Sequence, residues 1–518
     1  MSSAQASAPE TSRMKGMLKT FDVIERVGNK IPHPFWLFWI LAVCVIALSA
    51  ILAGIGVSAV NPATGKTVAV QSLISADGLQ TIIGDAVTNY ATFPPLATII
   101  TVLLGISVAQ RSGLIDSLLH RMVARVPARF LTFALVIAAM VSHVAGDAAY
   151  VTMIPLGALI FRAAGRSPLL GIVVTYVAIS AGYDASPSLT STDVLLSGIS
   201  TAAAHTIDPD YFVSPVSNYF FGLASSILIA VVITLVTETV LARHPHLTTD
   251  DDLAELSSDD RAKLEGTAKD RKALNVTGIV AVLFILGLIA ALIPHTSPLR
   301  GEDAGILNSV VFTGMAFILG FFFALLGAVY GFVSGNFTKP TEIITGMIEG
   351  VKSLAPILVL FFAISQFLAY FKWTKMGEVL AISGSDMLAK INAPAWAILL
   401  GIIVIVTIMN FFITSGSALW ALAAPVFIPM LMLLHISPEV TQAAYRIADS
   451  VTNCVTPMSP YFVMALGFMQ QYKKKAGIGT LASFTIPLSV VIWVVWVAFF
   501  LIWYLIGIPV GPGAPSGV

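Results

Sequence analysis

The sequence predicts an all-α polytopic membrane protein with nine transmembrane helices, two re-entrant helical hairpins and an inverted-topology repeat. The first observation is composition: 57% of the 518 residues are hydrophobic and only 11% are charged, whereas soluble chains carry roughly 25% charged residues. The second is that apolar runs of about 20 residues, long enough to cross a bilayer, recur along the chain. The third is that two pairs of short apolar segments with polar tips occupy corresponding places in two halves of the chain.

The first two spans follow a basic N-terminal segment. Residues 1–34 are polar and carry several Lys and Arg, so we expect them in the cytoplasm, where membrane proteins concentrate these residues. A span near 35–56 begins with aromatic residues typical of a membrane interface. A second apolar segment, near 79–110, is interrupted at Pro94 and Pro95, because proline lacks the backbone N–H that a helix needs.

A re-entrant hairpin is predicted at about 130–164. Its two apolar pieces are short and meet at a polar tip, and arginines flank both ends. Both ends are therefore expected in the cytoplasm, and a hairpin with its polar tip inside the protein satisfies that expectation. A broken span at about 168–205 and a span near 216–242 complete the first half, which covers residues 35–242.

A charged segment separates the two halves. Residues 243–272 hold a dense mixture of acidic and basic residues, which predicts a solvated cytoplasmic linker. The second half, 273–508, contains a re-entrant hairpin at about 394–434 and a broken span at about 438–470. Its other predicted features are spans near 275–294, 308–332, 351–371 and 478–508, an outward-facing connection at 372–392, and a Gly- and Pro-rich tail at 509–518.

The two halves are related by a weak repeat. Each holds a span, a hairpin and a broken span, and the charge distribution gives the two sets opposite orientation, which is typical of secondary transporters. At a constant offset of about 270 residues, four pairs of similar residues coincide: Gly146 with Gly416, Tyr150 with Trp420, Pro155 with Pro425, and Pro187 with Pro457.

The candidate site lies in the second broken span, where Arg446 and Asp449 interrupt an apolar run next to Pro457. Three residues apart on a helix, the two side chains share one face. They form either a structural ion pair or a substrate or coupling-ion site, and the cost of charges in hydrocarbon favours the site. The planar guanidinium suits a carboxylate or sulfonyl-like group. We expect Asp449 to be the main coupling carboxylate, with Asp193 as the competitor.

Further candidates surround this pair. Ser417 and Trp420 share a face at the tip of the second hairpin, where Trp420 is either a stacking wall for an aromatic substrate or a packing residue. Asn410 and Asn453 offer amide oxygens to Na⁺ or to the substrate, or else cap helices. Asp193 either caps the helix that follows it or lines the pathway.

Other classes of protein fit the sequence less well. His143 and Asp147 are four residues apart, but without a third ligand they do not indicate a metal site. We find no nucleophile–base constellation, so no enzyme activity and no cofactor is expected, and no G-x-x-x-x-G-K-[ST] nucleotide site. The zero net charge gives no sign of a nucleic-acid partner. A channel would predict a continuous polar stripe, whereas the polar residues of this chain gather in hairpins and breaks.

Four stretches of the sequence resemble the aminobenzoyl-glutamate transporter (AbgT) family, and the resemblance covers essentially the whole chain. They are Val27-Gly-Asn-Lys-Ile-Pro-His-Pro-Phe35, Ser415-Gly-Ser-Ala-Leu-Trp420, Ala443-Ala-Tyr-Arg-Ile-Ala-Asp-Ser-Val-Thr-Asn453 and Gly507-Ile-Pro-Val-Gly-Pro-Gly-Ala-Pro515. The resemblance implies a bowl-shaped homodimer in the bacterial inner membrane, with nine spans and two hairpins in each subunit. Family members import aminobenzoyl-glutamate or, in the MtrF and YdaH type of drug-efflux branch, export sulfonamide antimetabolites and para-aminobenzoate-like compounds.

The resemblance also implies a set of pathway residues. By match to the family's motifs they are Asp193, Asn410, Ser417, Trp420, Pro438, Arg446, Asp449 and Pro457. We therefore expect an ion-coupled secondary transporter with a cytoplasmic N-terminus that exports small aromatic amide or sulfonamide compounds by proton antiport. The alternative is a Na⁺- or H⁺-coupled importer of aminobenzoyl-glutamate, with a Na⁺ site near Asn410 and Asn453.

Overall fold

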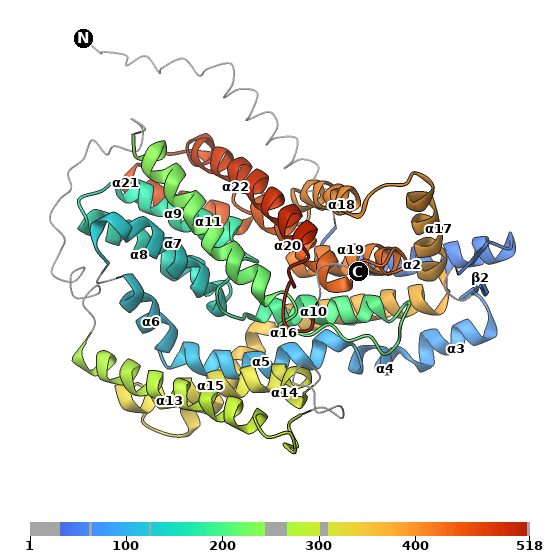
Figure 1. Cartoon of the computed structure of the whole chain (residues 1–518), viewed down its shortest axis with the longest axis horizontal. Coiled ribbons are helices and arrows are strands. Elements are labelled where there is room, and N and C mark those ends of the chain that lie inside the picture. The colour runs from blue at the N-terminus through green and yellow to red at the C-terminus, as the bar shows by residue number, and fades with distance from the viewer. Residues whose placement is uncertain (1–31, 62–64, 124–125, 244–266, 301–308, 515–518) are drawn as a thin grey trace, which may run out of the picture.

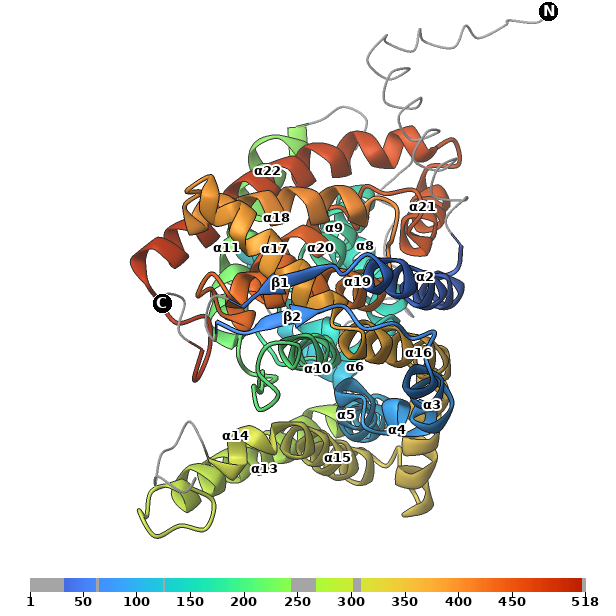
Figure 2. The same ribbon diagram turned by 90° about the vertical axis from the view of Figure 1, so that its right-hand side faces the viewer.

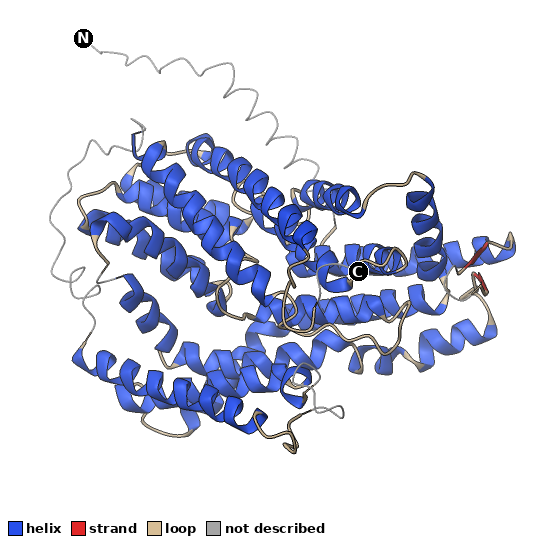
Figure 3. Ribbon diagram, viewed as in Figure 1, coloured by secondary structure: helices blue, strands red, loops and turns tan. Residues whose placement is uncertain are grey.

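The computed structural model describes residues 32–61, 65–123, 126–243, 267–300 and 309–514. Within these residues the protein is built almost entirely of helices, as Figure 3 shows. The exception is a two-stranded antiparallel sheet of β1 (Ser58–Val60) and β2 (Thr67–Ala69), in which Ser58 lies opposite Ala69. This hairpin was not predicted from the sequence. The helical fold agrees with the predicted all-α class, because hydrocarbon favours elements that satisfy their own backbone hydrogen bonds.

Seven helices of the described residues are long and apolar enough to cross a membrane. One of them corrects a predicted boundary: the span expected near 351–371 is part of a continuous 33-residue helix that begins at Thr341. At 1.5 Å per residue this helix is about 50 Å long, which exceeds the ~30 Å hydrocarbon core. The seven are α2 (Pro34–Gly54), α5 (Pro94–Arg111), α11 (Tyr219–Thr239), α13 (Ala268–Leu292), α15 (Met315–Ser334), α16 (Thr341–Trp373) and α22 (Ile478–Ile506).

Several of these long helices lie at the outside of the molecule. In Figures 1 and 2, α13 and α15 lie beside α5 at one side, while α11 and α22 lie at the opposite side. Arg111 at the end of α5 joins α16 through Glu342 (2.8 Å) and Glu349 (2.6 Å). Five shorter helices are α3 (Ala76–Gly84), α4 (Ala86–Ala91), α6 (Leu114–Val123), α14 (Val310–Thr313) and α17 (Met376–Lys390).

The two predicted hairpin regions each hold two short helices. The first contains α7 (Leu131–Val141) and α8 (Ala148–Ala163), joined by a 3₁₀ turn, η2 (Ser142–Ala145); two further 3₁₀ turns are η1 (Ala128–Phe130) and η3 (Leu241–Arg243). The second contains α18 (Ala395–Asn410) and α19 (Gly416–Met432). Their re-entrant placement in a membrane stays a prediction, as does the total of nine spans.

The two predicted broken spans repeat one another closely. The helix α9 (Pro168–Ala181) and the helix α20 (Pro438–Val451) both have 14 residues, both begin with proline and start 270 positions apart. Proline is well placed at a first helical position, where no N–H is needed. After each comes a non-helical break, at 182–190 and 452–459, and then a second helix, α10 (Ser191–Ala204) or α21 (Pro460–Tyr472). Pro187 and Pro457 lie in the two breaks, as the sequence echo indicates.

The linker and termini are only partly covered. Most of the charged segment 243–272 and most of residues 1–34 lie outside the described residues. The connection 372–392, predicted as an outward-facing segment, contains the helix α17. Of the tail 509–518, the described residues 509–514 contact the body of the protein, where the N–H of Phe221 donates to the carbonyl of Val510 (3.0 Å).

Candidate functional site

The candidate site forms where the two broken spans meet. The backbone N–H of Asp184, in the first break, donates to Ser450 Oγ on α20 (3.1 Å). The hydroxyl of Tyr176 on α9 donates to the carbonyl of Asn453 in the second break (3.3 Å). Each break leaves backbone groups without helical partners, and these contacts satisfy some of them across the two halves of the chain.

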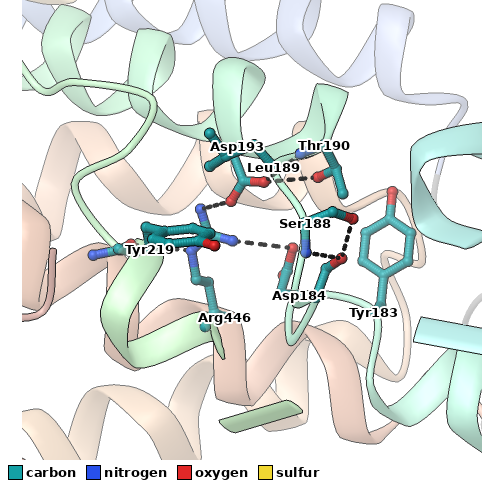
Figure 4. Close-up of a pocket in the computed structure, with 11 residues that line it drawn as sticks. Tyr183, Asp184, Ser188, Leu189, Thr190, Asp193, Tyr219 and Arg446 are labelled. Atoms are coloured by element: carbon teal, nitrogen blue, oxygen red, sulfur yellow. Dashed lines mark hydrogen bonds and ion pairs between the residues drawn. The ribbon is translucent and has the colours of Figure 1, made fainter. Parts of the chain in front are cut away.

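Arg446 is held by the first half of the chain. Its Nη2 lies 2.8 Å from Asp193 Oδ1 and its Nη1 lies 3.8 Å from Asp184 Oδ1, with the Arg446 side chain only 3% exposed. Its Nε donates to Asn218 Oδ1 (3.0 Å), just before α11. Figure 4 shows Asp193 and Asp184 converging on the guanidinium. Three sequence regions far apart in the chain therefore share one buried positive charge.

This arrangement corrects one interpretation of the sequence. The spacing of Arg446 and Asp449 allows an ion pair on one face of α20, but the salt bridges of Arg446 are to Asp193 and Asp184. The reason is that α20 is buried along its whole length, so different elements contact it at successive turns. The structural ion pair between Arg446 and Asp449 was a wrong interpretation.

Asp193 caps the helix that follows it and also pairs with Arg446, while its place in a transport pathway stays a prediction. Its Oδ2 accepts hydrogen bonds from the backbone N–H of Thr190 (2.7 Å) and from Thr190 Oγ1 (2.9 Å) at the start of α10. This is the reciprocal half of a capping box. Its Oδ1 pairs with Arg446. The cap fixes the carboxylate in the position from which it binds the guanidinium.

Asp449 faces the tip of the second hairpin instead. A Cβ added at Gly416 would lie 2.5 Å from Asp449 Oδ2, so the carboxylate rests directly against the backbone at the start of α19. The hydroxyl of Tyr445 donates to the carbonyl of Gly416 (2.6 Å) and holds the same contact from the preceding turn. Asp449 is 1% exposed, and its Oδ1 has no hydrogen-bond partner.

Asn410 joins the second hairpin to the end of α20. Its Nδ2 donates to the backbone carbonyl of Asp449, to Thr452 Oγ1 (2.8 Å) and to Asn453 Oδ1 (3.1 Å). It thus satisfies a carbonyl that the end of the helix leaves free. Asn410 Oδ1 is buried without a partner. The Na⁺ site expected near Asn410 and Asn453 stays a prediction.

Trp420 is a packing residue in this conformation. Its side chain is fully buried, its Nε1 donates to Ser200 Oγ on α10 (3.0 Å), and its ring centroid lies 4.3 Å from that of Tyr445. Ser417, one turn earlier, is partly buried, with its Oγ 3.4 Å from Ser415 Oγ. The role of Trp420 as a stacking wall stays a prediction that requires another conformation.

The two prolines have different positions. Pro438 is the first residue of α20, after Ser437, whose Oγ accepts from the backbone N–H of Val440 (3.3 Å). It therefore starts a helix rather than interrupting one. Pro457 lies in the break before α21, as predicted. Pro460 then begins α21.

The tip of the first hairpin is arranged differently from that of the second. Its turn passes through Gly146, which has φ +56°, a backbone conformation that glycine adopts without strain. His143 is buried with Nε2 2.9 Å from the carbonyl of Ile179 on α9, while Asp147 is exposed. The ring of Tyr150 stacks on Tyr461 of α21, with centroids 3.9 Å apart. Each hairpin thus places an aromatic side chain, Tyr150 or Trp420, against the second helix of the broken span in the opposite half.

A small cavity opens beside the guanidinium of Arg446. Its volume is about 10 Å³, which is space for about one water molecule. Tyr183, Asp184, Asp193, Asn218 and Arg446 are among the residues that line it. This cavity has no room for an aromatic substrate in the present conformation, so a substrate that binds beside Arg446 requires the surrounding helices to separate.

The comparisons with known proteins agree on one family. Residues 19–518 match the model of the "AbgT putative transporter family". The chain belongs to the AbgT family. It is 35% identical over 512 residues to the p-aminobenzoyl-glutamate transport protein of Escherichia coli strain K12, which covers 98% of this chain and 99% of that protein.

Two solved AbgT structures share the whole architecture. The Alcanivorax borkumensis YdaH transporter is 38% identical, with a TM-score of 0.86 over 93% of this chain and 100% of that one. Neisseria gonorrhoeae MtrF is 37% identical, with a TM-score of 0.90 over 96% of this chain and 100% of that one. The resemblance found in the sequence is confirmed, and the chain is an AbgT-family membrane transporter.

Two residues of the AbgT site were not predicted as candidates from the sequence. Asp184 was visible as an acidic residue in the first break, but no spacing rule linked it to Arg446. Asn218 gave no signal, because a polar residue before an apolar span is common at a membrane interface. Only the tertiary arrangement brings both of them to the guanidinium.

Proposed function

We propose that this AbgT transporter is an ion-coupled secondary transporter that exports sulfonamide antimetabolites and para-aminobenzoate-like compounds by proton antiport. The observation that carries the proposal is the buried meeting of Arg446 from the second half with Asp193 and Asp184 from the first. Buried ionisable groups between helices of a membrane protein typically mark substrate and ion pathways. Export is favoured because MtrF, a relative similar along its whole length, is described as belonging to a class of antimetabolite efflux pumps.

The substrate group that fits the site is anionic or strongly polar. A guanidinium donates hydrogen bonds in a planar fork that matches carboxylates and similar groups. In this conformation Asp193 occupies one edge of the fork and Asn218 accepts from Nε. A carboxylate or sulfonyl-like group of the substrate would therefore compete with Asp193 for Arg446. This competition links substrate binding to the contact between α10 and α20.

Ion coupling is assigned to Asp449. Its carboxylate touches the hairpin tip at Gly416, and its backbone carbonyl is bound by Asn410 at the end of the other hairpin helix. Protonation changes the charge at this contact, so it changes the attraction between α20 and the second hairpin. A transporter that alternates between two openings needs such a link between ion binding and helix movement.

Import of p-aminobenzoyl-glutamate is the second candidate function. It is favoured by the E. coli relative of that name, which is 35% identical over nearly the whole chain. Coupling to Na⁺ would use the same region, where Asn410 Oδ1 and Asp449 Oδ1 are buried oxygens without partners. Hard cations such as Na⁺ prefer oxygen ligands of this kind.

The membrane setting is part of the proposal. Residues 1–34 and 243–272 are assigned to the cytoplasm of a bacterium, and the chain to its inner membrane as a homodimer. Exposed apolar side chains on one helix support a lipid or subunit contact, namely Ile279, Val282, Leu283 and Leu286 of α13. Labelling of a cysteine in 243–272 by an impermeant reagent outside intact cells would overturn this topology.

Transport into proteoliposomes tests the function. Labelled sulfonamide and labelled aminobenzoyl-glutamate are offered separately, each with an imposed proton gradient or an imposed sodium gradient. Proton antiport predicts that sulfonamide accumulates on the acidic side, opposite to proton flow, without added sodium. Accumulation of aminobenzoyl-glutamate alone, in the direction of ion flow, would replace export with the import function.

A further inference from the structure

Asp184 is a buried carboxylate without a hydrogen-bond donor. It is 3% exposed, and neither Oδ1 nor Oδ2 has a hydrogen-bond partner. Its salt-bridge partner, Arg446 Nη1, is as far as 3.8 Å from Oδ1. Its backbone N–H is fixed by Ser450 Oγ on α20. The side chain is therefore held against α20, where it lines the small cavity.

The charges around Asp184 do not balance. One guanidinium, that of Arg446, pairs with the carboxyl groups of Asp184 and Asp193, and Asp184 is in turn beside Asp449. If all three were ionised, the buried cluster would carry two negative charges in excess. Uncompensated buried charge is strongly unfavourable, and a group in that situation takes up a proton. The other titratable side chains that face Asp184 are the hydroxyls of Tyr183 and Tyr445, which supply no positive charge.

Asp193 already has a donor at each oxygen. Its Oδ2 accepts two hydrogen bonds from Thr190, and its Oδ1 lies 2.8 Å from Arg446. Neither oxygen is left without a partner. The two carboxyl groups that remain are those of Asp184 and Asp449.

These two carboxyl groups are neighbours, because the backbone N–H of Asp184 is bound to Ser450, the residue after Asp449, and the two side chains interact with one another. As carboxylates both are acceptors only, which is why Asp184 Oδ1 and Oδ2 and Asp449 Oδ1 all lack partners. One proton between them would convert this repulsion into a strong hydrogen bond between an acid and a carboxylate. Pairs of adjacent carboxyl groups commonly hold one proton for this reason.

We propose that Asp184 and Asp449 hold one shared proton, so that the coupling proton is bound between the two halves of the transporter rather than by Asp449 alone. The proposal rests on the proposed function and deepens it by naming the second proton ligand. Asp184 belongs to the first break and Asp449 to α20. The bound proton therefore holds the two broken spans together in the closed conformation.

The proton cycle follows from this geometry. When the site opens and the two carboxyl groups separate, water replaces the hydrogen bond between them. The O–H bond of the acid then breaks, the proton passes to water on the open side, and both groups are left ionised. Closure of the empty site is unfavourable until one proton returns from water. Return of the empty transporter without a proton is thereby opposed, which is the condition for antiport.

Infrared spectroscopy of the purified full-length protein tests the shared proton without substrate or transport. A protonated carboxylic acid has a C=O stretching band that shifts in deuterated water and is absent from a carboxylate. We expect this band at neutral pH in the unsubstituted protein and its loss in both Asp184→Asn and Asp449→Asn. In each variant the new amide can donate to the remaining carboxylate, which favours its ionised form. Asp210→Asn, at an exposed position between α10 and α11, is the matched control and should keep the band.

Two results would overturn the shared proton: a band that persists in Asp184→Asn, or no band in the unsubstituted protein. Thermal unfolding in detergent and substrate exchange show whether Asp184→Asn is folded.

Transport measurements distinguish failure of the shared proton from failure of proton antiport. If Asp184→Asn concentrates substrate on a proton gradient as well as the unsubstituted protein does, the shared proton is wrong and proton antiport stands. If the band behaves as expected but no proton-driven transport occurs, proton antiport is wrong and the shared proton stands.

Discussion

The helices α9 and α20 occupy equivalent places in the two halves, yet their sequences differ in kind. Both have 14 residues, start with proline and are buried at every position. At the positions where α9 has Leu169, Tyr176 and Ile179, 270 residues earlier, α20 has Glu439, Arg446 and Asp449. Equal burial of an apolar and a charged helix shows that burial in this protein arises in two ways.

The first way is close packing of apolar surfaces. A Cβ added at Gly171 on α9 would lie 2.3 Å from the carbonyl oxygen of Gly157 on α8, so the two backbones touch. Small residues allow such contacts between helices in membranes. The second way is polar pairing, because the charges of α20 are buried against Asp193, Asn218 and Tyr211 from the first half. The helix α9 packs mostly against α7 and α8 of its own half, whereas α20 buries Arg446 and Glu439 against side chains of the other half.

Substitution of Arg446 should cause the largest loss of stability and so test the difference between α9 and α20. Arg446→Ala leaves Asp193 and Asp184 buried without their cation, and removal of one member of a buried ion pair costs about 3–5 kcal/mol. At the equivalent position of α9, Tyr176→Phe removes one hydrogen bond to Asn453 and should lower the unfolding free energy by about 1 kcal/mol. Thermal unfolding in detergent measures both. Equal losses of stability would mean that Arg446 is not the link between the halves.

Trp420 separates packing from substrate binding. Trp420→Ala leaves a large cavity beside Tyr445 and should cost about 3–5 kcal/mol of unfolding free energy. Trp420→Phe keeps most of the packing and loses the bond to Ser200, a cost of about 1 kcal/mol. Equilibrium binding of an aromatic substrate is then measured with the Phe variant. Unchanged affinity would leave Trp420 as a packing residue only.

Two glycine substitutions should have the smallest effects on stability, but they should differ clearly in their effects on transport. Gly171→Ala pushes against backbone and should cost about 1–3 kcal/mol, while transport per folded molecule stays close to normal. Gly416→Ala pushes against the movable carboxylate of Asp449, so it should cost less stability and reduce proton-driven transport more. Unfolding temperature and transport rate are compared for both. The reverse pattern would contradict the division between a packing helix and a site helix.

Much of the fold was predictable because hydrocarbon restricts the alternatives. Apolar length located the seven long helices, and proline with polar residues located both breaks. The β1–β2 hairpin and α17 were missed, since short elements in polar connections have no comparable signal. The sequence indicated which charged residues belong to the site, but it did not indicate which of them pair with one another. Arg446 and Asp193 are far apart in sequence, and no local spacing relates them.

The most direct test of proton coupling compares net transport with exchange for Asp449→Ala in proteoliposomes. We predict that this variant no longer concentrates substrate on a proton gradient, because its carboxyl group is needed to bind the coupling proton. It should still exchange labelled for unlabelled substrate across the membrane, because exchange does not require release of the proton. If Asp449→Ala still concentrates substrate against its gradient, Asp449 is a structural residue and the assignment of proton coupling to this site is wrong.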